Sequence, residues 1–563
     1  MVTKIKDIKY ERVDIAKMVE ATKKATAAVK NAASAEEIVS IRDGLNRQSR
    51  KVSTMCTLVY WRHTLDVNDK FYTAEQDYYD ENLPALWAEG AEFGRAVVES
   101  KHAAELEKLL NPLILQNIRA SVRVMDSRIV DDRVEENRLV TEYDKLMATL
   151  SFPWEGKGVP ISTMFRYCKD KDRAVRKKAF ETIGKTLESV SDKLDELYDK
   201  LVKVRDRMAK KMGFKSFVEM GDLRIGHVAY GRKEIGVFRN SVLRDVVPTL
   251  ARLKKSLADS LGIDHVHLYD NDNYVAGGNI DPEGDAEKLV AAAQKMYDDM
   301  HPALGSFFNQ LCEAEAIDYV ARDGKSPGGY CDILTDFGQP IIFANFNGTM
   351  DDVGVLTHEF GHAYAFKRAH DNDVDDDLGV GGMETAETHS MSMEALCNKY
   401  NDLFYGKRAD DATYQQIFDA FNFLAYGVIV DYFQELVYDK PDMTPSERKA
   451  LWIKLEGQFR PYVDMSDIPY ISIGGRWQYQ KHIYEVPFYY IDYCLSTCLA
   501  LQFGELAAKD HGEALSRYMT FVEAGGTKTI DTLAHEAGFF SPFDDGALKK
   551  LCADVEAHLK ALE

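Results

Sequence analysis

Apolar residues recur three and four positions apart through most of the first two hundred residues. Residues 34–66 and 171–213 show this spacing together with many Glu/Lys pairs and without proline. Because an α-helix turns once in 3.6 residues, the spacing places the apolar side chains on one face. A second block with the same rhythm runs from about Arg232 to Ala316, broken at 269–281, and residues 152–160 are expected to form a loop. The pattern therefore predicts a mainly α fold.

Signals for β-strands concentrate in residues 328–349, "GGYCDILTDFGQPIIFANFNGT". Two short runs of β-branched and aromatic residues flank a Gly/Pro turn there, which predicts a hairpin. Helices are expected directly afterwards, at 353–369 and 383–402, with the acidic stretch 371–379 as a turn between them. The predicted order is thus hairpin, helix, turn and helix.

The first of these helices contains the sequence HEFGH, with His358 and His362 four residues apart. Residues i and i+4 share one helix face, so both imidazoles are able to reach one zinc ion at about 2.0–2.1 Å. Glu359 is rotated about 100° from His358, beside the metal, where a carboxylate accepts a proton from zinc-bound water. The alternative is a packed helix with two core histidines, but chance rarely produces this spacing.

A catalytic zinc site needs a third protein ligand and an open fourth position. The next helix offers Glu384, Glu387 and Glu394, which lie three and seven residues apart near one stripe. Any of them is compatible with a ligand, with an acceptor for a histidine N–H, or with a surface ion pair. Spacing alone leaves the third ligand open.

Composition narrows the functional class. The formal charge of −21 over 563 residues argues against nucleic acid as a partner, because phosphate binding needs a basic surface. The start of the chain lacks the apolar segment of a secretory signal, and the apolar stretch 421–430 is too short to cross a bilayer and predicts a buried helix. The eight scattered cysteines fit reduced thiols, so we expect a cytoplasmic protein without membrane contact.

Two other pairs of residues have spacings that resemble those of metal sites. Cys494 and Cys498 have the i, i+4 spacing of a soft-metal site, although two small buried residues explain them better. Asp270 and Asp272 invite a calcium site, but the glycine and glutamate that a calcium loop requires are missing. We therefore expect two small buried residues at Cys494 and Cys498, and a solvated loop at Asp270 and Asp272.

HEFGHA, followed by "ETHSMSME" at 387–394, resembles the M3 family of zinc metallopeptidases, in the branch of oligoendopeptidase F and Pz-peptidase. The resemblance implies that Glu387 is the third zinc ligand. It also implies that the Glu394 carboxylate contacts a zinc ligand and not the metal itself, which leaves Glu384 as the less favoured ligand. It also implies one Zn²⁺ per chain.

The segment 473–493 is similar to the family's segment that carries a histidine and tyrosines facing the zinc ion. The resemblance places catalytic roles on His482 and on Tyr489, Tyr490 and Tyr493. The tyrosine spacing differs from that of better-known relatives, so which two of the three face the metal stays open.

The family further implies a large multi-helix fold around a deep cleft, with 1–200 as a helical N-terminal domain and 201–563 as the catalytic domain. The expected function is zinc-dependent endopeptidase activity on short unstructured oligopeptides, in a monomer or small homo-oligomer, with an extended substrate pairing to the hairpin edge. One alternative is a dipeptidyl carboxypeptidase, for which Arg476 offers a carboxylate-binding group. The other is a non-catalytic peptide-binding protein with a structural zinc.

Overall fold

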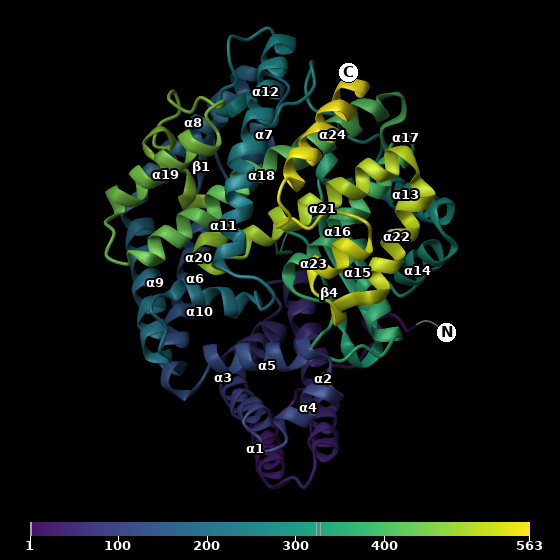
Figure 1. The fold of residues 1–563 in the computed structure, drawn as a ribbon. Helices are drawn as coiled ribbons and strands as arrows, with labels where there is room; N and C mark the ends of the chain where they lie inside the picture. The colour runs from purple at the N-terminus through teal and green to yellow at the C-terminus, as the bar shows by residue number, and fades with distance from the viewer. Residues whose placement is uncertain (1–2, 323, 327) are drawn as a thin grey trace. The chain divides into compact units, whose positions relative to one another are not determined.

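Figure 1 shows the fold of the chain as a ribbon. The chain divides into two compact units, each assembled from three separate stretches of sequence. The computed structural model describes residues 3–322, 324–326 and 328–563. Unit 1 comprises Met1–Val130, Asp281–Lys407 and Leu506–Gly538, and unit 2 comprises Asp131–Ile280, Arg408–Glu505 and Phe539–Glu563. The units interleave along the chain, and the predicted division at residue 200 stays a prediction.

Helices dominate both units, which confirms the mainly α prediction. The helices of unit 1 are α1 (Ile15–Asn31), α2 (Ala35–Leu65), α3 (Lys70–Val98), α4 (Ala103–Leu109), α5 (Pro112–Val124), α13 (Ala286–Met300), α14 (Pro302–Glu313), α15 (Met350–Asp371), α16 (Met383–Cys397), α17 (Asp402–Tyr405), α22 (His511–Ala524) and α23 (Ile530–Glu536). The helices that lie wholly or mainly in unit 2 are α6 (Val130–Thr149), α7 (Ile161–Cys168), α8 (Arg173–Ser189), α9 (Ser191–Met212), α10 (Phe217–Ile225), α11 (Arg232–Ser241), α12 (Val247–Leu261), α18 (Ala409–Asp439), α19 (Pro445–Phe459), α20 (Lys481–Glu485), α21 (Tyr490–Lys509) and α24 (Ala547–Leu562).

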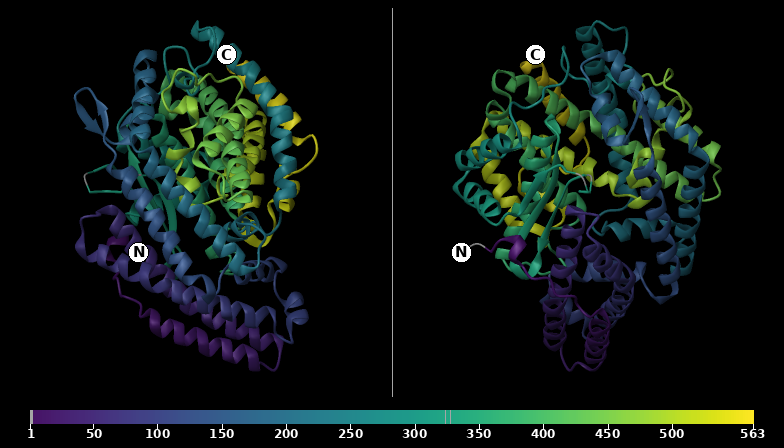
Figure 2. Two further views of the ribbon diagram at one scale, coloured as in Figure 1. Left: turned by 90° about the vertical axis from the view of Figure 1, so that its left-hand side faces the viewer. Right: turned by 180° about the vertical axis from the view of Figure 1, so that it is seen from behind.

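The N-terminal helices of unit 1 begin at polar caps and pack through apolar stripes. Asp14 accepts a hydrogen bond from the backbone N–H of Lys17 at the start of α1, and Ser34 caps α2 in the same way. Ile38 of α2 and Val97 of α3 are fully buried in one apolar cluster. The long helices α1, α2 and α3 consequently run side by side, in purple in Figure 2.

A three-stranded sheet of unit 1 has the order β3-β5-β4 (Figure 2, right). The strands β4 (Tyr330–Leu334) and β5 (Gln339–Phe346) are antiparallel, which confirms the predicted hairpin. The third strand, β3 (Ile317–Val320), pairs parallel to β5 and was not expected. The strand β4 lies between β3 and β5 in the sequence, so no tight turn links the parallel pair and marks it there.

The connection from the sheet to α15 is held by Asp352. Its carboxylate accepts hydrogen bonds from the backbone N–H groups of Asn347 at 2.9 Å and Gly348 at 2.7 Å. Gly348 has φ +85°, a conformation that glycine adopts without strain. Helix α15 then packs on β4 and β5, and α16 packs on α15 and α22. Both predicted helices are present, but α16 ends at Cys397, before a 3-10 turn at Asn398–Tyr400.

The core of unit 2 forms around α18, which contacts α9, α10, α19 and α24. The apolar stretch 421–430 lies in this helix and is largely buried, as predicted. Residues 152–160 are not the expected loop, because β1 (Phe152–Trp154) and β2 (Lys157–Val159) form a small hairpin. Its two turn residues, Glu155 and Gly156, both have positive φ, the conformation of a tight two-residue turn. Among the described residues, no helix combines the length and apolar composition that crossing a bilayer requires.

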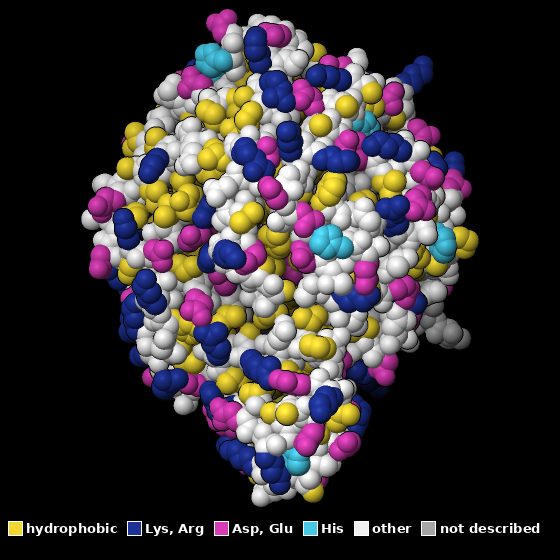
Figure 3. Space-filling model, in the orientation of Figure 1, with side chains coloured by type: hydrophobic (Ala, Val, Ile, Leu, Met, Phe, Trp, Pro, Cys, Tyr) yellow, Lys and Arg dark blue, Asp and Glu magenta, His cyan; other side chains and the backbone are white. Residues whose placement is uncertain are grey.

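Surface charges are distributed rather than gathered on the face shown in Figure 3, where acidic and basic side chains intermingle. The acidic stretch 371–379 is tied to α2, since Arg42 pairs with Asp375 and Asp377. In unit 2, Asp270 is fully buried and pairs with two arginines of α8, so the expected solvated loop is wrong at this position. The ion pairs leave Asp270 closed to a calcium ion.

Candidate metal centre

His358 and His362 project from one face of α15, with ring centroids 4.9 Å apart. Phe360, between them in sequence, points into an aromatic cluster with Tyr297 at 3.9 Å and Phe308 at 5.6 Å between ring centroids. This packing fixes the rotation of the helix about its axis. The two imidazoles are thereby held on the opposite face from the core.

Glu387 of α16 meets both imidazoles. Its Oε2 atom lies 3.2 Å from Nε2 of His358 and 3.4 Å from Nε2 of His362. Two ligand atoms of a tetrahedral zinc ion, each about 2.05 Å from the metal, are about 3.3 Å apart. The three side chains therefore converge with the separation that a single metal ion requires, and the group is suited to hold one.

Gly361 lets α16 approach closely enough for this contact. A Cβ atom at this position would lie 2.7 Å from Cα of Ser390 and 2.8 Å from the carbonyl oxygen of His389. Both are backbone atoms of α16, so no side-chain movement relieves the clash. The glycine inside HEFGH thus positions the helix that carries Glu387.

The other two glutamates of α16 occupy different places. Oε1 of Glu394 lies 2.7 Å from Nδ1 of His358, where it orients the ring and directs Nε2 towards Glu387. Glu384 instead lies back at the start of α16, where it accepts a hydrogen bond from Thr385. The fold separates three carboxylates that the spacing of the sequence left equivalent.

Glu359 is 7% exposed and lies on the side of α15 that faces β4. One of its carboxylate oxygens is 3.7 Å from where a Cβ atom of Gly329 would stand, so the missing side chain leaves room beside it. Burial raises the pKa of Glu359, and the two histidines oppose that shift. A carboxylate with a raised pKa is a better general base near neutral pH.

The electrostatics of the centre favour positive charge. Burial alone would lower the pKa of His358, but its hydrogen bonds to Glu387 and Glu394 raise it well above the ordinary value. Burial opposes ionisation of Glu387, yet the two histidines hold its pKa well below the ordinary value. A divalent cation satisfies the same demand, because it binds the carboxylate and both imidazoles together.

His482 and the three predicted tyrosines gather around one another in unit 2. The His482 ring lies 5.0 Å from Tyr490, 5.9 Å from Tyr489 and 6.1 Å from Tyr493, measured between centroids. Nε2 of Gln480 lies 3.0 Å from Nδ1 of His482. Burial raises the pKa of Tyr490, so its phenol stays protonated and able to donate a hydrogen bond. All three rings contact the histidine, so this geometry does not reduce them to two.

The remaining candidates of unit 2 have structural partners. Arg476 donates to Glu456 at 3.0 Å and to the Tyr479 hydroxyl at 3.1 Å. Cys494 and Cys498 are buried, and burial raises the pKa of both thiols well above the ordinary value. Within the described part of the chain, they belong to no group of three potential metal ligands.

Sequence reasoning missed the residues that position the centre rather than form it. Asp352, Phe360 and Gly361 all act through helix placement. The glycine within HEFGH and the acidic start of α15 were visible signals. The structural role of each residue depends on which atoms of other elements contact it in the fold.

The chain resembles known peptidases along its full length. The profile of the Peptidase M3 N-terminal domain matches residues 5–125, and that of Peptidase family M3 matches residues 166–552. No curated protein sequence matches the chain.

Among solved structures, Pz peptidase A with an inhibitor is 35% identical, with 99% of both chains covered and a TM-score of 0.94. A protein assigned as oligoendopeptidase F is 36% identical, again with 99% of both chains covered and a TM-score of 0.93. A protein of the same assignment from Bacillus anthracis is 32% identical over 99% of this chain and 98% of that one, with a TM-score of 0.88. The chain therefore belongs to peptidase family M3 and is a metallopeptidase.

Proposed function

We propose that this protein is a zinc-dependent endopeptidase that cleaves internal bonds of short unstructured oligopeptides. The observation that carries the proposal is the meeting of His358, His362 and Glu387 at separations of 3.2 and 3.4 Å, with Glu359 buried beside them. Structural zinc sites close all four positions with protein ligands and need no base. Three ligands and an adjacent carboxylate fit a hydrolytic site.

His358, His362 and Glu387 are the proposed ligands of one zinc ion, with Glu394 orienting His358. Two neutral imidazoles and one carboxylate leave a bound zinc ion with net positive charge. When bound, the ion would lower the pKa of a water molecule and polarise the scissile carbonyl.

Glu359 is the proposed general base. Its carboxylate takes the proton of the attacking water and delivers it to the leaving amine, so that one side chain serves both halves of the reaction. Its burial supports this role, because a desolvated carboxylate accepts a proton more readily than an exposed one.

On the family resemblance, we further propose that His482 and the tyrosines 489, 490 and 493 supply hydrogen bonds to the transition state. Phenols that remain protonated are suitable donors to a developing oxyanion, and one such donor is worth about 3 kcal/mol. The raised pKa of Tyr490 supports this role.

Substrate backbone recognition is proposed at β4. This strand lies at one edge of its sheet and pairs with β5 on one side. An extended peptide adds to such an edge through main-chain hydrogen bonds and needs no particular side chain. Binding of this kind favours unstructured oligopeptides over folded proteins.

A cytoplasmic location is proposed as well. All eight cysteines are free, which supports a reducing setting. We also propose that the protein is a monomer or a small homo-oligomer.

The first test pairs metal analysis with hydrolysis of an internally quenched peptide. We expect chelation to abolish turnover and added zinc to restore it. Turnover that survives complete removal of metal would exclude the proposed chemistry.

Glu359→Gln tests the base. The amide keeps the size of the side chain but accepts no proton, so zinc should remain bound while kcat falls about 10²–10⁴-fold. Asp371→Asn, at the exposed end of the same helix, is the matched control and should retain the parental rate. A non-catalytic peptide-binding protein would hydrolyse nothing in either form.

Free and amidated C-termini distinguish an endopeptidase from a dipeptidyl carboxypeptidase. An endopeptidase should cut both forms of one quenched peptide at similar rates. Arg476 is engaged by Glu456 and Tyr479, which favours this outcome. Strong preference for the free carboxylate would support the carboxypeptidase instead.

A further inference from the structure

Two segments of unit 2 bring a second group of potential metal ligands together. Residues 264–268 follow α12, and residues 464–467 follow α19. They are joined by a parallel backbone bridge in which Asp464 N–H donates to Val266 O at 2.9 Å and Leu268 N–H donates to Asp464 O at 2.8 Å. In extended backbone, residues two apart face the same side, so His265 and His267 both turn towards the neighbouring segment.

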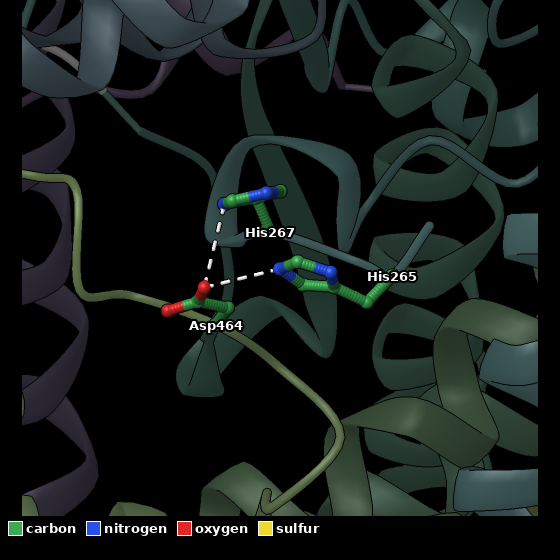
Figure 4. Close-up of side chains that lie close together, drawn as sticks. All are labelled: His265, His267 and Asp464. Atoms are coloured by element: carbon green, nitrogen blue, oxygen red, sulfur yellow. Dashed lines mark hydrogen bonds and ion pairs between the residues drawn. The ribbon is translucent and has the colours of Figure 1, made fainter. Parts of the chain in front are cut away.

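One carboxylate oxygen of Asp464 faces both imidazoles (Figure 4). Its Oδ2 atom is 3.1 Å from Nε2 of His265 and 3.9 Å from Nδ1 of His267. Asp467 approaches the same ring, with Oδ1 3.4 Å from Nδ1 of His267. Two ligand atoms of a tetrahedral zinc ion are about 3.3 Å apart. The ligand atoms of His265, His267 and Asp464 all lie within 4.8 Å of one another, so a small closure would bring these three donors around one ion.

Each carboxylate has one oxygen committed to the protein and the other directed at the histidines. Oδ1 of Asp464 accepts the backbone N–H of Ser466 at 2.8 Å, and Oδ2 of Asp467 pairs with Lys177 at 2.7 Å. Outer contacts of this kind orient the ligands of metal sites.

Two atoms of this group are buried without a hydrogen bond. Nδ1 of His267 and Oδ1 of Asp467 are both shielded from solvent. They face each other at 3.4 Å, and among the described residues neither makes a hydrogen bond. Buried polar atoms are rarely left in this state, and an ion is one of the partners that satisfies them. His267 is further held in place by stacking on Tyr269, at 4.9 Å between centroids and 14° between ring planes.

We propose that His265, His267 and Asp464 bind a second zinc ion apart from the HExxH centre. Two imidazole nitrogens and a carboxylate oxygen suit zinc better than calcium or magnesium, which prefer sites made of oxygen alone. The ion fastens residues 264–268 to the start of the segment that runs on to His482.

The test counts zinc ions and leaves activity aside. Metal-free protein is titrated with Zn²⁺ in competition with a chromophoric chelator. The parent should bind two equivalents, His362→Ala should lose the HExxH site, and His265→Ala should lose the second site. In His362→Ala, zinc should still raise the melting temperature. In the double variant His265→Ala/His362→Ala, this rise should disappear.

Asp264→Asn is the matched control, because this exposed carboxylate neighbours His265 and lies outside the metal-binding group. It should bind two equivalents. The ring of His265 is 55% exposed, so its removal costs little packing, and circular dichroism checks the fold of each variant. His267→Ala, which also loses its stacking, should weaken the second site at least 100-fold.

Two results would overturn the proposal. One is a His362→Ala protein that binds no zinc at all. The other is a full second equivalent in both His265→Ala and His267→Ala, which would reduce the group to a set of hydrogen-bonded surface side chains. Neither result bears on the HExxH centre, whose proposed function is judged by chelation and by Glu359→Gln.

Discussion

At the scale of single residues, the proposed metal centre depends on which atom each carboxylate presents to an imidazole. Glu387 contacts the Nε2 atoms of both histidines, whereas Glu394 contacts Nδ1 of His358. The two nitrogens of one ring thus meet carboxylates with different roles. Geometry thus distinguishes the proposed ligand Glu387 from Glu394, which orients His358, although both are glutamates of α16.

Substitution of the three α16 glutamates by glutamine should rank them by zinc affinity. We expect Glu387→Gln to raise the Kd for zinc by more than about 100-fold, and Glu394→Gln to raise it about 10–100-fold, because it only supports His358. Glu384→Gln should leave the Kd near the parental value. The Kd is measured by competition with a chelator at the HExxH centre, in a His265→Ala background. A larger effect at Glu384 than at Glu387 would refute the assignment.

The tyrosines can be ranked in the same manner. A Tyr→Phe change at 489, 490 or 493 removes one hydroxyl and retains the ring. A tyrosine that donates to the transition state should lose about 10²–10³-fold in kcat with little change in KM. Steady-state kinetics on the quenched peptide identifies it. Phe423, which contacts Tyr490 and Tyr493 through its ring alone, supplies the control as Phe423→Leu, for which we expect a much smaller change in kcat.

At the scale of secondary-structure elements, the spacing of α15 and α16 controls the metal centre. Gly361 lies where the two helices touch, and Gly354 lies two turns earlier on α15 in open space. A Cβ atom at 354 would meet only an oxygen of Glu394, at 3.9 Å, whereas one at 361 would meet α16 backbone atoms within 3 Å.

The two glycines form a matched pair for substitution by alanine. Gly361→Ala should lower the free energy of unfolding by about 1–3 kcal/mol through overpacking and should weaken zinc binding by displacing Glu387. Gly354→Ala should be neutral or stabilise by up to about 1 kcal/mol, since alanine favours helices over glycine. Denaturant unfolding and zinc titration measure both effects. Equal behaviour of the two variants would show that helix contact does not set the site.

At the scale of the whole molecule, buried charge makes stability depend on pH. His227 lies between Asp492, 2.7 Å from Nε2, and Asp222, 3.3 Å from Nδ1. Burial alone would lower the pKa of His227, but the two carboxylates raise it to about 10. Tyr230 also donates to Asp492, and Arg232 pairs with Asp222. This network ties the end of α10 to α21, the helix that begins at the predicted tyrosines.

The sign of the pH effect follows from proton counts. Above about pH 6.5 the unfolded histidine is neutral, while the folded one stays protonated up to about pH 10. The stabilisation by His227 is therefore complete below about pH 6.5 and declines as pH rises, by at most about 1.4 kcal/mol per pH unit. Lys254, whose pKa burial lowers to about 7, has the opposite effect over the same range.

Comparison of the parent with His227→Gln isolates this contribution, because Lys254 is common to both proteins. The difference in their free energies of unfolding should be largest near pH 6 and should shrink towards about pH 10. Urea unfolding across this range measures it. A difference that does not change with pH would mean that His227 is neutral in the folded protein.

Some elements of the fold were predictable from the sequence, and others were not. The helical spacing of 34–66, the hairpin at 328–349 and the buried helix around 421–430 were predictable, because local periodicity dictates which face is apolar. The strand β3 was missed because β4 lies between it and its partner β5, so no tight turn marks the pair. The hairpin at 152–159 was missed because its turn is formed by Glu-Gly. The presence of α16 after the acidic turn was predictable, but the end of this helix at Cys397 was not.

By itself, the sequence determined that the protein is mainly α and that His358, Glu359 and His362 share one turn of helix, since both follow from spacing along a single element. The resemblance to peptidase family M3 was also present in the sequence and is confirmed. Only the tertiary structure decided that Glu387 rather than Glu384 lies against both imidazoles and that Gly361 must admit α16. It also brought His265 and His267 to Asp464, 199 positions from His265. These contacts join separate elements. The spacing of residues within one element does not determine which other element packs against it.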